Sequence, residues 1–157
     1  MILTRRPPRR KSIRCAALAG CIFAVLNAAC EAVEFRSIAP QAAILYDAPS
    51  VKARRLYILN QNYPVEIVVS LEGWFKVRDA AGGLAWVEAK DLSTRKIAMV
   101  KVARAEVRKA AAENAPVVFQ ADQDVLLEVL DVTDNWAHVR HADGSVGYVR
   151  ITQVWGL

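Results

Sequence analysis

The chain contains an internal repeat at one constant offset, and this repeat constrains its fold more than any other feature. The segment 73–78 (GWFKVR) aligns with the segment 135–140 (NWAHVR). The same offset, without a gap, aligns further identical or similar residues: Gln61 with Gln123, Glu66 with Glu128, Ala80 with Ala142, Gly82 with Gly144, Trp86 with Tyr148 and Val87 with Val149. Such self-similarity indicates two copies of one structural unit. We therefore predict two related domains, at residues 33–97 and 98–157.

Both copies show the pattern of short strands separated by turns. Runs rich in Val, Ile and Leu, followed by alternating segments, occupy equivalent ranges in the two copies: 65–71 and 125–132, 74–79 and 136–141, and 84–88 and 146–150. Short runs with turn signals between them are typical of a small sandwich or barrel. The composition of residues 103–113 favours a helix, but the aligned segment 41–51 contains Pro49, so we predict no helix there. The predicted fold class is all-β.

The glycine-bearing turn of the first copy predicts how its two flanking strands pair. If residues 80–82 form a three-residue loop with the glycine in the left-handed conformation, Val77 lies opposite Ala85 and Phe75 lies opposite Val87. Directly opposed residues share a face of the sheet, so these side chains are expected to point into the core.

The second copy repeats this arrangement and places a glycine at one inward position. Ala137, Val139, Gly147 and Val149 are expected to face the core, and a small residue such as Gly147 lets another strand approach closely. The opposite, outward face then holds aromatic rings beside cations in both copies. These eight residues are the candidate ligand-binding set: Trp74, Lys76, Arg78 and Trp86 in the first copy, and Trp136, His138, Arg140 and Tyr148 in the second.

Segments 73–78 and 85–87, joined by a glycine turn, resemble the pattern of bacterial SH3 (SH3b) domains, and the second copy resembles it too. The second copy also has Val107-Arg108 where the family has an N-V-R segment, whereas the first has Leu45-Tyr46. The resemblance covers nearly all of residues 37–157. It implies two tandem SH3-like barrels, each a bent antiparallel sheet of five strands. It also implies an exported targeting module for cell-wall peptidoglycan, or a protein-interaction module.

The N-terminal segment 1–32 has the order of a secretory signal peptide. A basic head without acids, residues 1–14, precedes an apolar run from Cys15 to Ala29 and then small residues. We predict a signal helix cleaved after Ala32, since the apolar run is shorter than the roughly 20 residues of a permanent membrane span. The alternatives are a buried helix, a short membrane anchor, or lipidation at Cys21, where residues 18–21 (LAGC) resemble a lipobox. Cleavage is favoured, because too few apolar residues precede Cys21.

Removal of residues 1–32 changes the charge and removes every thiol. Six of 21 basic residues and one of 16 acidic residues lie in that segment, so 15 of each remain. A mature chain without net charge gives no overall indication of nucleic-acid binding. All three cysteines also lie in the removed segment, which excludes a cysteine nucleophile or a cysteine metal site in the mature chain.

The remaining residues lack the pattern of a catalytic centre. The two histidines, His138 and His141, are three positions apart on one predicted strand, so their side chains point to different faces. No phosphate-binding loop or nucleophile elbow is present. Paired aspartates occur only at predicted strand ends and turns, where aspartate has a structural role. We therefore predict no enzymatic activity, no metal and no cofactor.

Two functions remain open for a periplasmic chain with outward aromatic residues. In the first, aromatic grooves bind peptidoglycan glycans or stem peptides, because rings provide flat contact area at low entropic cost. In the second, the chain is a scaffold that holds an envelope protein through a groove or a sheet edge. Tryptophans open to solvent would favour the first function, and tryptophans buried between the domains would favour the second. Neither function involves a nucleic acid or a stable membrane span.

Overall fold

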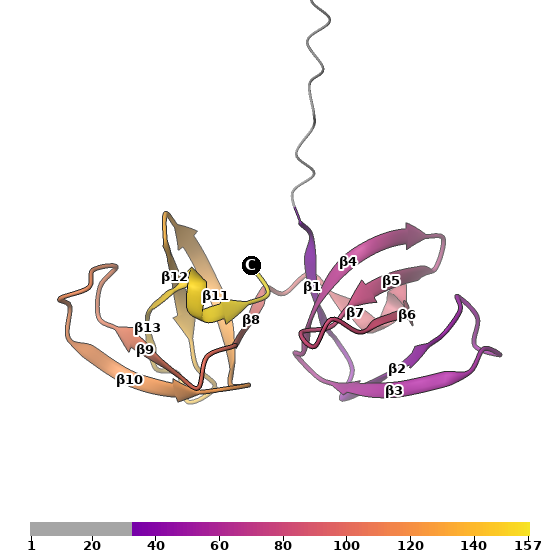
Figure 1. Ribbon diagram of the computed structural model, residues 1–157, viewed down its shortest axis with the longest axis horizontal. Helices are drawn as coiled ribbons and strands as arrows, with labels where there is room; N and C mark the ends of the chain where they lie inside the picture. The colour runs from indigo at the N-terminus through magenta and orange to yellow at the C-terminus, as the bar shows by residue number, and fades with distance from the viewer. Residues whose placement is uncertain (1–32) are drawn as a thin grey trace, which may run out of the picture. The chain divides into compact units, whose positions relative to one another are not determined.

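The computed structural model of the protein describes residues 33–157. The predicted signal peptide at residues 1–32, its cleavage site and the alternative lipidation site at Cys21 lie outside the described residues. Two antiparallel sheets of seven strands each make up the described chain (Figure 1). The described part of the chain has no helix that is both long and apolar enough to cross a membrane.

Each strand of the first sheet recurs in the second sheet at the offset that the repeat predicts. The first sheet consists of β1 (Phe35–Ile38), β2 (Ala42–Tyr46), β3 (Arg55–Asn60), β4 (Pro64–Leu71), β5 (Trp74–Arg78), β6 (Leu84–Glu88) and β7 (Leu92–Ser93). The second consists of β8 (Ile97–Val100), β9 (Arg104–Arg108), β10 (Val117–Asp122), β11 (Leu126–Thr133), β12 (Trp136–Arg140), β13 (Val146–Arg150) and β14 (Val154–Trp155). One 3-10 turn precedes the last strand of each sheet, η1 (Ala89–Asp91) and η2 (Ile151–Gln153).

The strand order is the same in both sheets, with β3-β2-β6-β5-β4-β1-β7 repeated as β10-β9-β13-β12-β11-β8-β14. The resemblance implied five strands per domain. The structure has two more, because the long hairpin at residues 42–60 forms β2 and β3, and its counterpart in the second copy forms β9 and β10. The predicted boundary between residues 97 and 98 falls within β8, whose first residue, Ile97, already pairs with Glu128 of the second sheet.

The two domains have separate hydrophobic cores built from equivalent positions. Five fully buried residues of the first core each have a fully buried counterpart at the aligned position of the second: Ile38 and Val100, Leu45 and Val107, Val65 and Leu127, Val77 and Val139, and Val87 and Val149. Strands supply these residues alternately, as expected for sheets with one face packed and one face exposed. Each domain therefore contains its own complete core.

The predicted hairpin register is confirmed in both domains. Val77 pairs with Ala85 and Phe75 pairs with Val87, and the second copy pairs Val139 with Gly147 in the same way. The turn glycine, Gly82, has a positive φ of 88° in the first domain. Because the loop length was inferred correctly, every side chain of the hairpin lies on its predicted face.

The decision against a helix at residues 103–113 is also confirmed. This segment contains β9 and then a loop. Ala105 and Val107 are buried on one face of β9, and the residues beside them are partly or fully exposed. Helix propensity differs by only tenths of a kcal/mol per residue among ordinary residues, so burial of this alternating pair decides the conformation.

A β-bulge bends the long strand of each sheet at an equivalent position. In β4 the register shifts between Ile67 and Val69, and in β11 it shifts between Val129 and Asp131. A bulge inserts one extra residue and increases the local twist. The bend carries the end of β4 around the core, and it places Leu71 opposite Trp74.

A buried carboxylate holds the β5–β6 turn of the first domain. The Asp79 Oδ1 atom accepts hydrogen bonds from the backbone N–H groups of Gly83, at 2.7 Å, and Ala81, at 3.0 Å. The Tyr57 hydroxyl donates to Asp79 Oδ2 at 2.8 Å. The second domain replaces this Tyr–Asp pair by Phe119 and His141, whose ring centroids are 5.8 Å apart. The two turns are therefore supported by different chemistry.

The Tyr57–Asp79 contact predicts a pH dependence that is confined to the first domain. Burial, and then the hydrogen bond to Asp79, raise the pKa of the Tyr57 hydroxyl above its ordinary value of 10.0. The folded state thus holds this proton more tightly than the unfolded state, so the stability it contributes is complete below about pH 10 and is lost as pH rises further. Tyr57→Phe should therefore reduce the loss of stability at alkaline pH, measured by urea unfolding from neutral pH to about pH 11. Burial also raises the pKa of Tyr63, but that residue is unchanged in the variant. If Tyr57→Phe shows the same pH profile as the wild type, the role assigned to Tyr57 is contradicted, whereas Tyr63 is not tested.

Candidate functional site

The outward face of the β5–β6 hairpin is the candidate site in the first domain. Backbone pairing sets Lys76 opposite Trp86, and Trp74 opposite Glu88, on the side away from the buried core residues. Tyr46 of β2 pairs with Trp86 and extends this face across a third strand. The structure therefore brings together Trp74, Lys76 and Trp86 of the predicted set.

Trp74 forms the centre of a patch of aromatic and apolar residues on this face. Its ring packs edge-on against the buried ring of Tyr46, with centroids 5.5 Å apart and an interplanar angle of 85°. Leu71, directly opposite Trp74 on β4, is 51% exposed. We name Tyr46, Leu71, Trp74 and Trp86 the aromatic patch. Sequence reasoning missed Tyr46 as a site residue, because its role depends on the pairing of β2 with β6.

Charged groups of η1 lie at one end of the aromatic patch. The Ala89 N–H donates to the carbonyl oxygen of Gly73, which anchors η1 beside the start of β5. Lys90 forms an ion pair with Glu88 at 2.9 Å. Partial burial raises the pKa of the Asp91 carboxyl, an effect that Lys90 opposes. This end of the aromatic patch therefore has two carboxylates, Glu88 and Asp91, and one cation, Lys90.

Arg78 does not join the aromatic residues. It lies four residues from Trp74, about 13 Å along an extended strand, and its guanidinium contacts both carboxylate oxygens of Glu66 at 2.9 Å. Arg78 therefore lies apart from Trp74, although both residues are on the same face of β5.

In the second domain the predicted tryptophan lies on the expected face but is covered. Trp136 is only 8% exposed, and the guanidinium of Arg150 lies 4.8 Å above its ring centroid. The prediction that this ring is free to contact a ligand is therefore corrected. The cause is the residue opposite Trp136, which is Arg150 here and Glu88 at the equivalent place in the first domain.

The other predicted residues of the second domain separate into two groups. His138 and Tyr148 stack with ring centroids 4.6 Å apart and an interplanar angle of 12°. Arg140 instead lies at the far end of β12, where its guanidinium contacts Glu128 at 3.3 Å. Glu128 also binds Arg95, at 3.2 Å, so one carboxylate holds two guanidinium groups.

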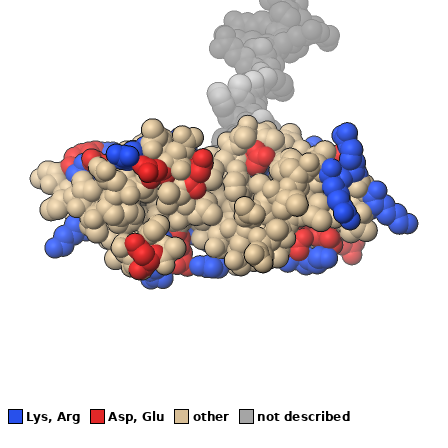
Figure 2. All heavy atoms as spheres, turned by 90° about the horizontal axis from the view of Figure 1, so that it is seen from below, with Lys and Arg blue, Asp and Glu red and all other residues tan. Residues whose placement is uncertain are grey.

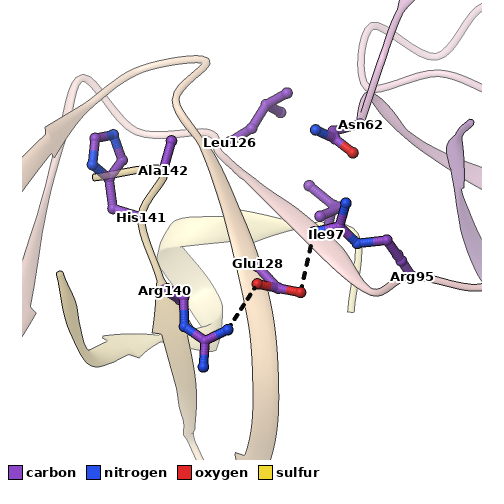
Figure 3. Close-up of a pocket in the computed structure, with 8 residues that line it drawn as sticks. All are labelled: Asn62, Arg95, Ile97, Leu126, Glu128, Arg140, His141 and Ala142. Carbon is purple, nitrogen blue, oxygen red and sulfur yellow. Dashed lines mark hydrogen bonds and ion pairs between the residues drawn. The ribbon is translucent and has the colours of Figure 1, made fainter. Parts of the chain in front are cut away.

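This shared carboxylate lies in a pocket of about 300 Å³ (Figure 3). Its lining residues are Asn62, Arg95, Ile97, Leu126, Glu128, Arg140, His141 and Ala142. Figure 3 shows both guanidinium groups directed at Glu128. Sequence reasoning missed Arg95, because no local pattern relates it to a strand so much further along the chain. Within residues 33–157 no three side chains of His, Cys, Asp or Glu come together as metal ligands.

The C-terminal Trp155 contacts both sheets. Its backbone pairs with Met99 of β8, which attaches the tail to the second domain. Its ring packs edge-on against Phe35 of β1, with centroids 5.0 Å apart. This ring therefore has a structural contact.

Two copies of one small antiparallel unit, each with an aromatic residue beginning the central hairpin, define a tandem SH3-like protein. The model of the bacterial SH3 domain matches residues 39–94 and 101–156. The chain belongs to the bacterial SH3 domain family. No curated protein matches it.

Solved structures that are similar to the chain include two proteins whose names contain NlpC. NlpC2 from Trichomonas vaginalis has a TM-score of 0.38 and 16% identity, over 79% of this chain and 48% of that protein. A NlpC/P60 family protein from Bacillus cereus has a TM-score of 0.35 and 15% identity, over 78% of this chain and 56% of that protein. The chain thus spans about half the length of each.

Proposed function

We propose that the chain is an exported, periplasmic binding module without catalytic activity, and that its aromatic patch binds cell-wall peptidoglycan. The observation that supports this most is the half-buried Trp74 ring, fixed by Tyr46 beside the exposed Leu71. A rigid ring with an apolar neighbour suits an extended glycan or peptide, since little side-chain entropy is lost on binding. The acidic groups at η1 would face an amine of a stem peptide.

The distribution of charge agrees with a ligand that is not a polyanion. Figure 2 shows Lys and Arg interspersed with Asp and Glu, and wide areas without either, on the face it presents. A nucleic-acid surface would instead need a continuous basic patch.

Sedimentation with purified peptidoglycan sacculi tests the proposal on the predicted mature chain, residues 33–157. The wild type is expected to sediment, and Trp74→Ala is expected to weaken its apparent affinity at least about tenfold, as for a central aromatic contact. Leu84→Ala is the matched control, because Leu84 is an exposed apolar residue of the same hairpin at its far end. It should bind like the wild type.

Two results would contradict wall binding. One is a wild type that stays in the supernatant, and the other is equal binding by the wild type and a folded Trp74→Ala variant. The scaffold function would then be favoured, and one observation supports it independently. The edge strand β3 exposes Leu56 and Ile58, and an edge of this kind can pair with a strand of another protein. Cross-linking from position 58 to envelope proteins would test that function.

A further inference from the structure

The second domain has a polar hollow where the first domain has its aromatic patch. The hollow has a volume of about 170 Å³. It is lined by residues of β9, β12, β13, η2 and the loop at residues 109–116: Glu106, Arg108, Glu113, Trp136, Arg150 and Gln153. Two guanidinium groups in so small a space are suited to one planar anion, because their N–H groups match the two oxygens of a carboxylate.

Both arginines are held in place before any ligand binds. Arg150 lies over the Trp136 ring, and cation–π contact of this kind limits the movement of the guanidinium. The Arg108 Nη1 atom donates to the carbonyl oxygen of Ala115 at 2.8 Å, and the Arg108 side chain is only 20% exposed. Prior orientation lowers the entropy lost when an anion binds.

One carboxylate of the chain, from a loop, already contacts Arg150. Glu113 forms an ion pair with Arg150, and its own side chain is 65% exposed. An exposed ion pair of this kind contributes little to stability, so another carboxylate can replace it. Arg108 has a separate partner in Glu106, on its own strand.

The equivalent positions of the first domain have the opposite character. Arg108 corresponds to Tyr46, Arg150 to Glu88, and Gln153 to Asp91. The aromatic patch therefore has no arginine at these positions to bind a carboxylate. Glu88 and Asp91, which replace Arg150 and Gln153, would repel a bound carboxylate. Any carboxylate specificity belongs to the second domain alone.

We propose that Arg108 and Arg150 bind the terminal carboxylate of a peptide or similar acid, and that Glu113 competes with this carboxylate for Arg150 in the free protein. Binding then exchanges one Arg150 carboxylate partner for another, whereas the hydrogen bond from Arg108 to Ala115 continues to hold the loop at residues 109–116. This inference goes beyond the wall-binding proposal and stands without it, since it concerns the other domain and a different ligand group.

Titration with a matched pair of probes tests the inference by NMR. The probes are N-acetyl-alanyl-alanine with a free carboxylate and the same dipeptide as its C-terminal amide. The chain has four tryptophans, so the four indole N–H signals report on separate places. The carboxylate is expected to shift the Trp136 signal, and the amide should leave it unchanged at the same concentrations.

Two variants and one matched control sharpen the test. Arg150→Gln should weaken binding of the carboxylate probe at least about tenfold, because a charge-assisted pair is lost. Glu113→Gln should tighten binding of this probe roughly two- to fivefold, because a competing surface ion pair is removed. Glu88→Gln, at the position of the first domain equivalent to Arg150, should change nothing.

Equal binding of acid and amide would overturn the inference, as would an unshifted Trp136 signal. Weaker binding by Glu113→Gln would overturn the displacement of Glu113. That variant alters an exposed side chain, so its folding is not at risk, and the probe pair needs no variant. The sacculus experiment depends on Trp74, so the two proposals fail separately.

Discussion

Leu127→Ala is expected to lower the free energy of unfolding of the second domain by about 2–5 kcal/mol, the usual cost of removing a fully buried leucine side chain. Leu127 is fully buried in the second core. A domain of this size has only about 3–5 kcal/mol from its core, so the variant should leave much of the second domain unfolded at room temperature. The first domain has its own core and should stay folded.

Hydrogen exchange of the strand amides measures this effect in each domain separately. In the variant, β11 amides should exchange much faster, whereas β4 amides should keep their protection. Leu130→Ala is the control on the same strand, because Leu130 is exposed at the bulge, and it should cost less than about 1 kcal/mol. Equal loss of protection in β4 and β11 would show that the two cores unfold as one unit.

Gly147→Ala is expected to have the second largest effect, about 1–3 kcal/mol, because it overpacks a close approach between strands. A Cβ atom at this position would lie 2.7 Å from the carbonyl oxygen of Arg108 and 2.7 Å from Val107 Cγ1. Backbone atoms cannot move aside as a flexible side chain can. The predicted reason for a glycine at this inward position, the close approach of another strand, is confirmed.

The first domain provides the matched control for this substitution. Ala85 occupies the equivalent position and is buried in the first core, so Ala85→Gly should cost only about 0.5–1 kcal/mol, the difference in strand propensity and chain entropy. In thermal unfolding, 1 kcal/mol corresponds to a shift of roughly 4–8 °C for a domain of this size. A Gly147→Ala variant that melts with the wild type would contradict the close packing of β13 against β9.

The repeat and the hairpin faces were predictable from sequence because both depend on short-range regularities. A constant offset needs no knowledge of the fold, and a glycine turn determines which residues oppose each other. The bulges after Ile67 and Val129 were not predictable, because an inserted residue leaves the run of β-branched and aliphatic residues unbroken. The additional pairing of β2 with β3 was not predicted either, because a long loop and a hairpin can have similar amino-acid compositions.

The candidate site was predicted in part, and the misses have a common cause. Trp74 and Trp86 could be placed on one face from local register. The cover over Trp136 was missed although the same register sets Arg150 opposite it, because register gives the pairing of residues and not the position of a guanidinium over a ring. Arg78 was placed in the candidate ligand-binding set from its face alone, whereas the length of the strand separates it from Trp74.

The sequence differences between the two copies also affect whether each domain pairs its own strands during folding. Adjacent domains of similar sequence are prone to exchange equivalent strands while folding. If β6 entered the second sheet in place of β13, Ala85 would bring a methyl group against the carbonyl oxygen of Arg108, where only Gly147 fits. The opposite exchange would place Arg150 beside Lys90, in the position that Glu88 normally takes, so that two cations would repel each other. Divergence at these few positions thus disfavours the mispaired product and directs each strand to its own domain.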